Sequence, residues 1–280
     1  MTRQPAQSRG LRQARPLSEA PTQTLRSLQG VMTDIDDTLT RDGQIESQAL
    51  QALHTLHAAG LPVIAITGRP LGWSEPFARE WPLAALVAEN GAVALVRQGA
   101  EVHTEYEQDA ATRAHNAQRL LAAARRIVRE VPGAVLARDS AGRVTDIAID
   151  HSEFTHLPPQ GIATVVEAMR QEGMTATVSS IHINGWFGDH SKWTGAQWML
   201  RRLFGRDLQA ELAHWVYVGD STNDQVMFER FPISVGVSNL RRFADELVHW
   251  PAWITQGERG QGFAELAQAL LQARQAAAHA

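Results

Sequence analysis

The segment "LQGVMTDIDDT" at Leu28–Thr38 joins a short apolar run to a cluster of acidic residues. An apolar run of this length that ends in polar side chains is typical of a buried strand. Asp34 and Asp36 lie on the same side of such a strand, because successive side chains alternate between its two faces. Two close acids at the end of a strand predict a magnesium site or an acid–base pair, and an acidic surface turn is the structural alternative. An EF-hand is disfavoured, since Leu39 stands where that loop needs glycine.

The segments that follow alternate between helix and strand. Residues 45–60, "IESQALQALHTLHAAG", have apolar side chains at helical spacing, whereas residues 61–68, "LPVIAITG", form a second short apolar run. Residues 82–92, "PLAALVAENGA", form a third. The alternation resumes near the end of the chain with helix, strand, helix, strand and helix at residues 191–205, 214–221, 223–231, 233–238 and 262–274. This order indicates βαβ units and predicts an α/β fold with a Rossmann-like parallel sheet.

The middle of the chain has a different pattern. Turn signals at Gln98-Gly99 and Ala141-Gly142 predict two hairpins, and helical patterns cover about residues 109–130 and 159–172. These hairpins and helices predict an inserted α+β module. We therefore expect a polar, disordered tail at residues 1–25, a catalytic core at 26–92 and 187–280, and an inserted cap at 93–186.

Composition excludes several classes of protein and site. The 280 residues carry a formal net charge of −4, which gives no reason to expect a nucleic-acid partner. The chain has no cysteine, so disulfides and thiolate metal sites are excluded. The sequence lacks an apolar run long enough to cross a membrane, and its N-terminus lacks the apolar stretch of a secretory signal. A soluble, cytoplasmic protein is expected.

Two further motifs follow predicted strands. Thr67 and Gly68 in "ITGRP" offer a hydroxyl and a backbone N–H that can bind a phosphate oxygen, although for this motif alone a plain strand-to-turn transition is the favoured explanation. In "VGDSTND", Asp220 follows a strand, whereas Asn223 and Asp224 open the next helix, where such residues are commonly caps.

Lys192 is the only lysine among the 26 basic residues of the chain. In a chain that otherwise uses arginine, a retained lysine suggests a site that rejects the planar guanidinium and accepts a compact ammonium group. Chance is the alternative. The four groups of residues nevertheless fall at equivalent places of a βα pattern, and this combination is more specific than any one of them.

These residues resemble the motifs of the haloacid dehalogenase superfamily of phosphotransferases. "DIDDT" is similar to its D-x-D-x-T motif, "ITGR" to its threonine motif, Lys192 to its lysine motif and "GDSTND" to its acidic motif. The long insert, with "AENGA" at its entrance, resembles the Cof-like branch. That branch includes phosphatases of sucrose phosphate, trehalose phosphate and mannosylphosphoglycerate, together with phosphomannomutases.

The resemblance implies a role for each matched residue. Asp34 would be the nucleophile that carries an aspartyl phosphate, and Asp36 the general acid and base. Mg²⁺ would be bound by the Asp34 and Asp220 carboxylates and the Asp36 main-chain carbonyl. The phosphoryl group would be bound by Thr67, Gly68, Lys192 and Asn223, with Asp224 supporting the metal and lysine from behind.

The sequence departs from the branch at three places. Asp37 stands where glycine is usual, "WTGA" follows the lysine in place of an immediate glycine, and "HINGWFGDHS" replaces the usual proline-glycine turn before it. In the cap, His182, Asn184 and Trp186 alternate along a predicted strand and are candidates for contacts with a sugar, while core packing is the alternative for the tryptophan.

The resemblance implies a magnesium-dependent phosphatase that hydrolyses a small phosphorylated metabolite, with a sugar phosphate as the expected class. A phosphosugar mutase shares the first chemical step and is the nearest alternative. A non-catalytic metabolite-binding protein of the same fold is the second alternative, and the intact set of acidic residues and lysine speaks against it.

Overall fold

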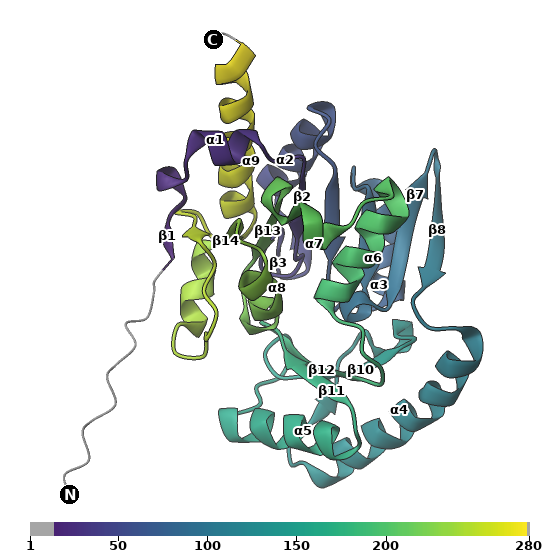
Figure 1. Ribbon diagram of the computed structural model, residues 1–280. Coiled ribbons are helices and arrows are strands. Elements are labelled where there is room, and N and C mark those ends of the chain that lie inside the picture. The colour runs from purple at the N-terminus through teal and green to yellow at the C-terminus, as the bar shows by residue number, and fades with distance from the viewer. Residues whose placement is uncertain (1–13, 279–280) are drawn as a thin grey trace, which may run out of the picture.

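A computed structural model describes residues 14–278 of the chain, and its centre is a nine-stranded sheet (Figure 1). Neighbouring strands pair in parallel except at β6–β7 and β7–β8, which are antiparallel. In spatial order the strands are β1 (Arg15–Pro16), β15 (Trp253–Ile254), β14 (Ser234–Gly236), β13 (Trp215–Gly219), β2 (Gly30–Thr33), β5 (Val63–Ile66), β6 (Ala85–Ala88), β7 (Val93–Gln98) and β8 (Glu101–Tyr106). The predicted α/β fold with a parallel sheet is confirmed.

The central strands are apolar along their whole length because helices cover both faces of the sheet. In β5, Val63 and Ala65 face one hydrophobic cluster, and Ile64 and Ile66 face the other. Each fully buried aliphatic side chain contributes ~1.5–3 kcal/mol to stability. The first face is covered by α2 (Ser47–Ala58), α3 (Leu71–Glu80) and α9 (Arg259–Ala278), and the second by α6 (Lys192–Phe204), α7 (Leu208–Glu211) and α8 (Gln225–Arg230).

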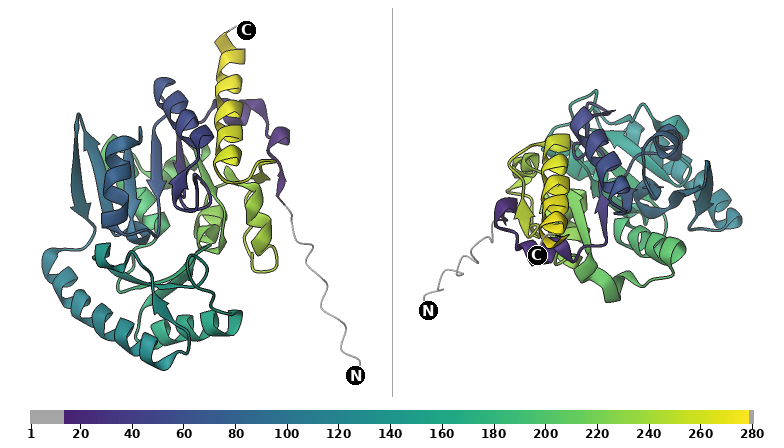
Figure 2. Two further views of the ribbon diagram at one scale, coloured as in Figure 1. Left: turned by 180° about the vertical axis from the view of Figure 1, so that it is seen from behind. Right: turned by 90° about the horizontal axis from the view of Figure 1, so that it is seen from above.

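The cap is a four-stranded antiparallel sheet with two helices on its outer face (Figure 2). Its strand order is β11 (Thr175–Val178), β12 (His182–Trp186), β10 (Asp146–Asp150) and β9 (Val135–Leu136), and its helices are α4 (Ala110–Glu130) and α5 (Pro159–Gln171). In β12, Ile183 packs toward the helices, while Asn184 reaches the main-chain carbonyl of Gly68 in the core. The alternation in β12 therefore separates a packing face from a face that meets the core.

Two predicted boundaries are wrong. The hairpin at Val93–Tyr106 extends the main sheet, because β7 pairs with β6, so the cap begins after β8 and not at residue 93. Of the expected tail, residues 1–13 lie outside the described residues, whereas the rest is ordered. It forms β1 and α1 (Thr22–Arg26), and the side chains of Leu17 and Leu25 are buried in the core. A few apolar side chains thus anchor a segment whose composition is polar.

The remaining strands, β3 (Thr40–Arg41) and β4 (Gln44–Ile45), form a small hairpin. Asp42 and Gly43 both have positive φ, as an Asp-Gly hairpin turn requires. Among residues 14–278, none of the helices combines the length and apolar character needed to cross a bilayer.

Candidate active site

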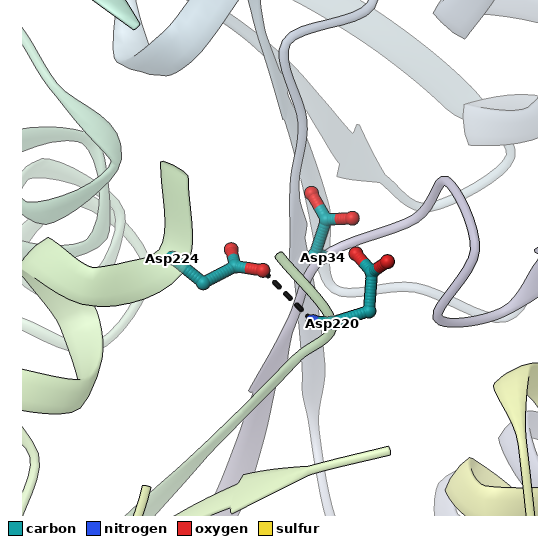
Figure 3. A group of neighbouring side chains, drawn as sticks. All are labelled: Asp34, Asp220 and Asp224. Carbon is teal, nitrogen blue, oxygen red and sulfur yellow. Dashed lines mark hydrogen bonds between the residues drawn. The ribbon is translucent and has the colours of Figure 1, made fainter. Parts of the chain in front are cut away.

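The carboxyl edge of the main sheet collects the polar residues of three motifs. Asp34, Thr67 and Asp220 directly follow β2, β5 and β13, and β2 lies between the other two strands. Parallel strands end at the same edge, so these side chains are brought together by the sheet itself. Figure 3 shows the carboxylates of Asp34, Asp220 and Asp224 gathered at this place.

Lys192 enters the same site from the first residue of α6. The helix begins there because Ser191 and Thr194 form a reciprocal capping box. The Lys192 side chain is 2% exposed, and its Nζ donates to Asp34 Oδ1 at 2.5 Å and to Asp224 Oδ1 at 2.7 Å. The start of α6 also packs on Gly91 (φ +111°), where any Cβ would overlap the Ser191 carbonyl. The "AENGA" segment therefore helps to place the lysine.

Asp224 is fully engaged by its neighbours. Its Oδ1 accepts from Tyr217 Oη at 2.5 Å as well as from Lys192, and its Oδ2 accepts from the backbone N–H groups of Asp220 and Ser221 at 2.9 and 3.1 Å. The carboxylate thus orients the lysine and the Asp220 loop. Sequence reasoning missed Tyr217, although a tyrosine in a buried strand needs a partner for its hydroxyl.

The acidic cluster fits a divalent cation. Oxygen atoms of Asp34, Asp220 and Asp224 lie within 4.8 Å of one another, and Asp220 Oδ1 is buried without a hydrogen-bond partner among residues 14–278. Because both oxygens of Asp224 are already used, the free carboxylate oxygens come from Asp34 and Asp220. Hard oxygen donors of this kind suit Mg²⁺.

Electrostatics explain why such a cluster needs a cation. Burial, opposed by Lys192 and reinforced by Asp224 and Asp36, raises the pKa of Asp34 to about 8. Burial and the neighbouring Asp34 and Asp224 also raise the pKa of Asp220 well above its ordinary value. Burial opposes the charge of Lys192, but Asp224 and Asp34 outweigh it and raise the pKa of the ammonium group. Three buried carboxylates therefore share one lysine, and a positive charge among them is favoured.

Arg69 connects the acid of the first motif to the cap. Its Nε donates to both oxygens of Asp36, at 3.0 and 2.9 Å, and its terminal nitrogens donate to Glu153 at 2.7 and 3.3 Å and to Asp139 at 3.2 Å. The Arg69 side chain is 4% exposed. Arg69 stands in the "ITGRP" turn and Glu153 belongs to none of the predicted motifs, so the sequence did not indicate this contact.

The loop after β5, which the sequence predicts to bind phosphate, is held by hydrogen bonds. Thr67 is buried, and its Oγ1 accepts from the backbone N–H of Arg69 at 3.0 Å. The Gly68 carbonyl accepts from Arg143 Nη1 at 3.0 Å and from Asn184 Nδ2 at 3.3 Å, and both donors belong to the cap. Asn223 lies on the other side of the site, where its Oδ1 accepts from Ser221 Oγ at 3.0 Å.

The three cap candidates have different surroundings. His182 and Asn184 line a small cavity of about 10 Å³ together with Asp34, Asp36, Gly68 and Arg69. Trp186 does not line that cavity; its Nε1 donates to the His190 carbonyl at 3.0 Å, and its ring stacks on the His190 ring. Trp186 instead borders a wider cleft of about 490 Å³ beside Lys192 and Asn223.

Asp37 has a conformation that explains the usual glycine at this position. Its φ is +55°, in the left-handed region that glycine adopts without strain. The carboxylate accepts from Arg259 Nε at 2.6 Å and from Arg242 Nη2 at 3.3 Å. The extra negative charge is therefore compensated by two arginines from the C-terminal part of the chain.

Comparison with known families supports the resemblance that the motifs predicted. Residues 31–125 match the family model of the haloacid dehalogenase-like hydrolases, the superfamily that the motifs resemble. No curated protein matches the chain by sequence.

Solved structures share the whole fold at low identity. A Thermoplasma acidophilum protein has a TM-score of 0.67 at 14% identity, covering 87% of this chain and 98% of the other. The Synechocystis sucrose-phosphatase, solved with sucrose and phosphate, has a TM-score of 0.61 at 16% identity, covering 88% and 98%. The C. albicans trehalose-6-phosphate phosphatase C-terminal domain has a TM-score of 0.63 at 13% identity, covering 90% and 96%. At these identities the likeness shows the fold alone.

Proposed function

We propose that this protein is a magnesium-dependent phosphatase that hydrolyses a small phosphorylated metabolite, a sugar phosphate, through an aspartyl-phosphate intermediate. The observation that carries the proposal is the buried contact of Lys192 Nζ with Asp34 Oδ1 at 2.5 Å, within a cluster of three carboxylates. A buried nucleophile candidate beside a cation, at the carboxyl edge of a parallel sheet, suits phosphoryl transfer. The hydrolase family model and the sugar-phosphatase folds support the same class.

Asp34 would attack phosphorus. In the first step one oxygen of its carboxylate forms a bond to phosphorus while the bond to the leaving oxygen breaks. Lys192, already beside this carboxylate, would meet the phosphoryl oxygens that gather negative charge in the transition state. Removal of one such preorganised donor costs ~10²–10³ in kcat in comparable sites. Asp224 and Tyr217 would hold the lysine in position.

The cation site complements this chemistry. Mg²⁺, held by the carboxylates of Asp34 and Asp220 and the main-chain carbonyl of Asp36, would draw charge from the phosphoryl oxygens and reduce their repulsion with the nucleophile. Thr67 and Gly68 lie at the end of β5, which pairs with β2, the strand that leads to Asp34. This position beside the nucleophile suits groups that would bind the phosphoryl oxygens.

Asp36 would transfer the protons. In the first step it would give a proton to the leaving oxygen, and in the second it would take one from the water that hydrolyses the aspartyl phosphate. The side chain is held at both oxygens by Arg69, and Arg69 is held in turn by cap residues. Contact with the cap thus fixes the group that serves both steps.

The test is phosphate release from a panel of phosphorylated metabolites, p-nitrophenyl phosphate and acetyl phosphate, with and without Mg²⁺. We expect turnover that requires Mg²⁺ and falls by at least ~10³-fold in Asp34→Asn. The matched control is Asp42→Asn in the β3–β4 turn, which should keep wild-type turnover because its side chain is exposed and does not line the cavity beside Asp34.

Two outcomes would count against the proposal. Absence of phosphate release from every compound by a folded, Mg²⁺-saturated protein would contradict phosphatase activity. Isomerised sugar phosphate without free phosphate would identify a mutase instead, in which the phosphoryl group returns to the substrate.

A further inference from the structure

The wall opposite the nucleophile is lined by cap residues and by Arg69 of the core, and carboxylates of the cap lie directly behind Arg69. The small cavity beside Asp34 and Asp36 is bounded by residues 179–182 and Asn184 of the cap and by Arg69 of the core. Because Asp36 would protonate the leaving oxygen, the organic part of the substrate must begin on this side. The charges in this wall therefore act on the leaving group.

Both guanidinium groups in the wall are already fully paired. Arg69 donates to Asp36, Asp139 and Glu153. Arg143 donates to Asp139, Asp146 and the Gly68 carbonyl, and its side chain is 2% exposed. Four carboxylates thus surround two guanidinium groups, and neither arginine has a free fork to offer an anionic ligand.

Glu153 contributes a negative charge at neutral pH. Burial opposes that charge, but contacts with His182 and Arg69 outweigh it and lower the pKa of Glu153 to about 2. His182 Nε2 lies 2.8 Å from Glu153 Oε2, so the imidazole is also engaged by this carboxylate. The groups left to contact a ligand are hydroxyls, an amide and carboxylate oxygens, which match the hydroxyl groups of a sugar or polyol.

We propose that the paired arginines and excess carboxylates of this wall select phosphate monoesters of uncharged sugars or polyols and reject leaving groups that carry a carboxylate or a second phosphate. This specificity rests on the proposed function. A second anion would be placed in a poorly solvated site near the carboxylate of Glu153, where like charges repel strongly and neither guanidinium group is free to pair with it.

The test compares substrates that differ in the charge of the leaving group. We expect kcat/KM for glucose 6-phosphate to exceed that for 6-phosphogluconate, and kcat/KM for glycerol phosphate to exceed that for 3-phosphoglycerate, by on the order of 10-fold or more. Glu153→Gln keeps the shape of the side chain and removes one negative charge, so it should reduce each ratio several-fold. Glu130→Gln, at an exposed position of α4, is the matched control and should leave the ratios unchanged.

The failure of this inference is distinguishable from failure of the proposed function. Turnover of acetyl phosphate that depends on Asp34 reports the phosphatase chemistry whatever the leaving group. If that turnover is present and the carboxylate-bearing substrates equal or exceed their neutral counterparts, the charge selection is refuted. Unchanged ratios in Glu153→Gln would also refute the role of the cap carboxylate.

Discussion

Replacement of Lys192 by methionine is the perturbation that tests the electrostatic argument most directly. Methionine keeps the length and apolar character of the lysine stem, which is buried at 2% exposure, and removes the charged ammonium group with its hydrogen bonds. Asp34 and Asp224 lose a donor at 2.5 and 2.7 Å and remain buried. Breaking a buried ion pair by removing one partner costs ~3–5 kcal/mol, so we expect the free energy of unfolding to fall by about this amount at pH 7.5.

The measurement is urea unfolding followed by circular dichroism, at pH 7.5 and at pH 9 without Mg²⁺. The destabilisation should be larger at pH 9, because the pKa of Asp34, which burial raises to about 8 beside the lysine, rises further when the lysine is removed, so only the variant keeps a proton on this buried carboxyl at pH 9. Lys192→Arg keeps the charge and is the matched variant. It should retain more stability than Lys192→Met, while its phosphate release falls by ~10²–10³-fold, since the planar fork cannot occupy the position of Nζ.

One result would refute this reasoning. If Lys192→Met unfolds within about 0.5 kcal/mol of the wild type at pH 7.5, the two carboxylates do not depend on the lysine, since changes of that size are typical of sites without a buried interaction. Full activity of Lys192→Arg would show that the single lysine is an accident of composition.

Three further outcomes follow from particular contacts. His190 is buried with neither ring nitrogen hydrogen-bonded among residues 14–278, and burial lowers its pKa to about 4, so its neutral form stabilises the fold above pH 6.5 and this stability is lost as the pH falls toward 4. Urea unfolding should show a loss between pH 7 and pH 4.5 that is roughly 2–3 kcal/mol larger for the wild type than for His190→Gln, and equal losses would contradict the assignment. At Asp37, with φ +55°, thermal unfolding should find Asp37→Ala less stable than Asp37→Gly by about 1 kcal/mol, because both lose the arginine pairs and only alanine keeps the left-handed strain. Gly91→Ala would overlap the Ser191 carbonyl and should lower both Tm and phosphate release, whereas Gly99→Ala, with open space at a hairpin tip, should cost only about 1 kcal/mol and leave turnover intact; similar effects of the two would refute a role for Gly91 in placing Lys192.

Local sequence was sufficient to predict most of the core. Short apolar runs that end in polar residues identify buried parallel strands, and the ends of parallel strands must meet at one edge of the sheet. Asp34, Thr67 and Asp220 could therefore be placed together from the sequence alone. Lys192 could be singled out as a candidate site residue for a different reason: it is the one lysine in a chain that otherwise uses arginine.

Pairing between distant segments was not predictable in the same way. The turn residues Gln98-Gly99 predict the hairpin of β7 and β8. They do not indicate that β7 pairs with β6, and this pairing is what makes the hairpin part of the main sheet. The composition of the segment around Leu17 and Leu25 predicts a polar tail. The segment is ordered because these two leucines pack against the core, which the local sequence does not indicate.

The sequence by itself determined the α/β core and the sheet edge at which the acidic residues meet, because the periodicity and the ends of strands are local properties of the chain. The tertiary structure alone decided which cap residues form the opposite wall of the candidate site. Arg69 and Glu153 are 84 residues apart, and they meet only because the cap packs on the core. Trp186 likewise packs on His190 and lies outside the small cavity, since the path of the chain back to the core decides which neighbours surround it.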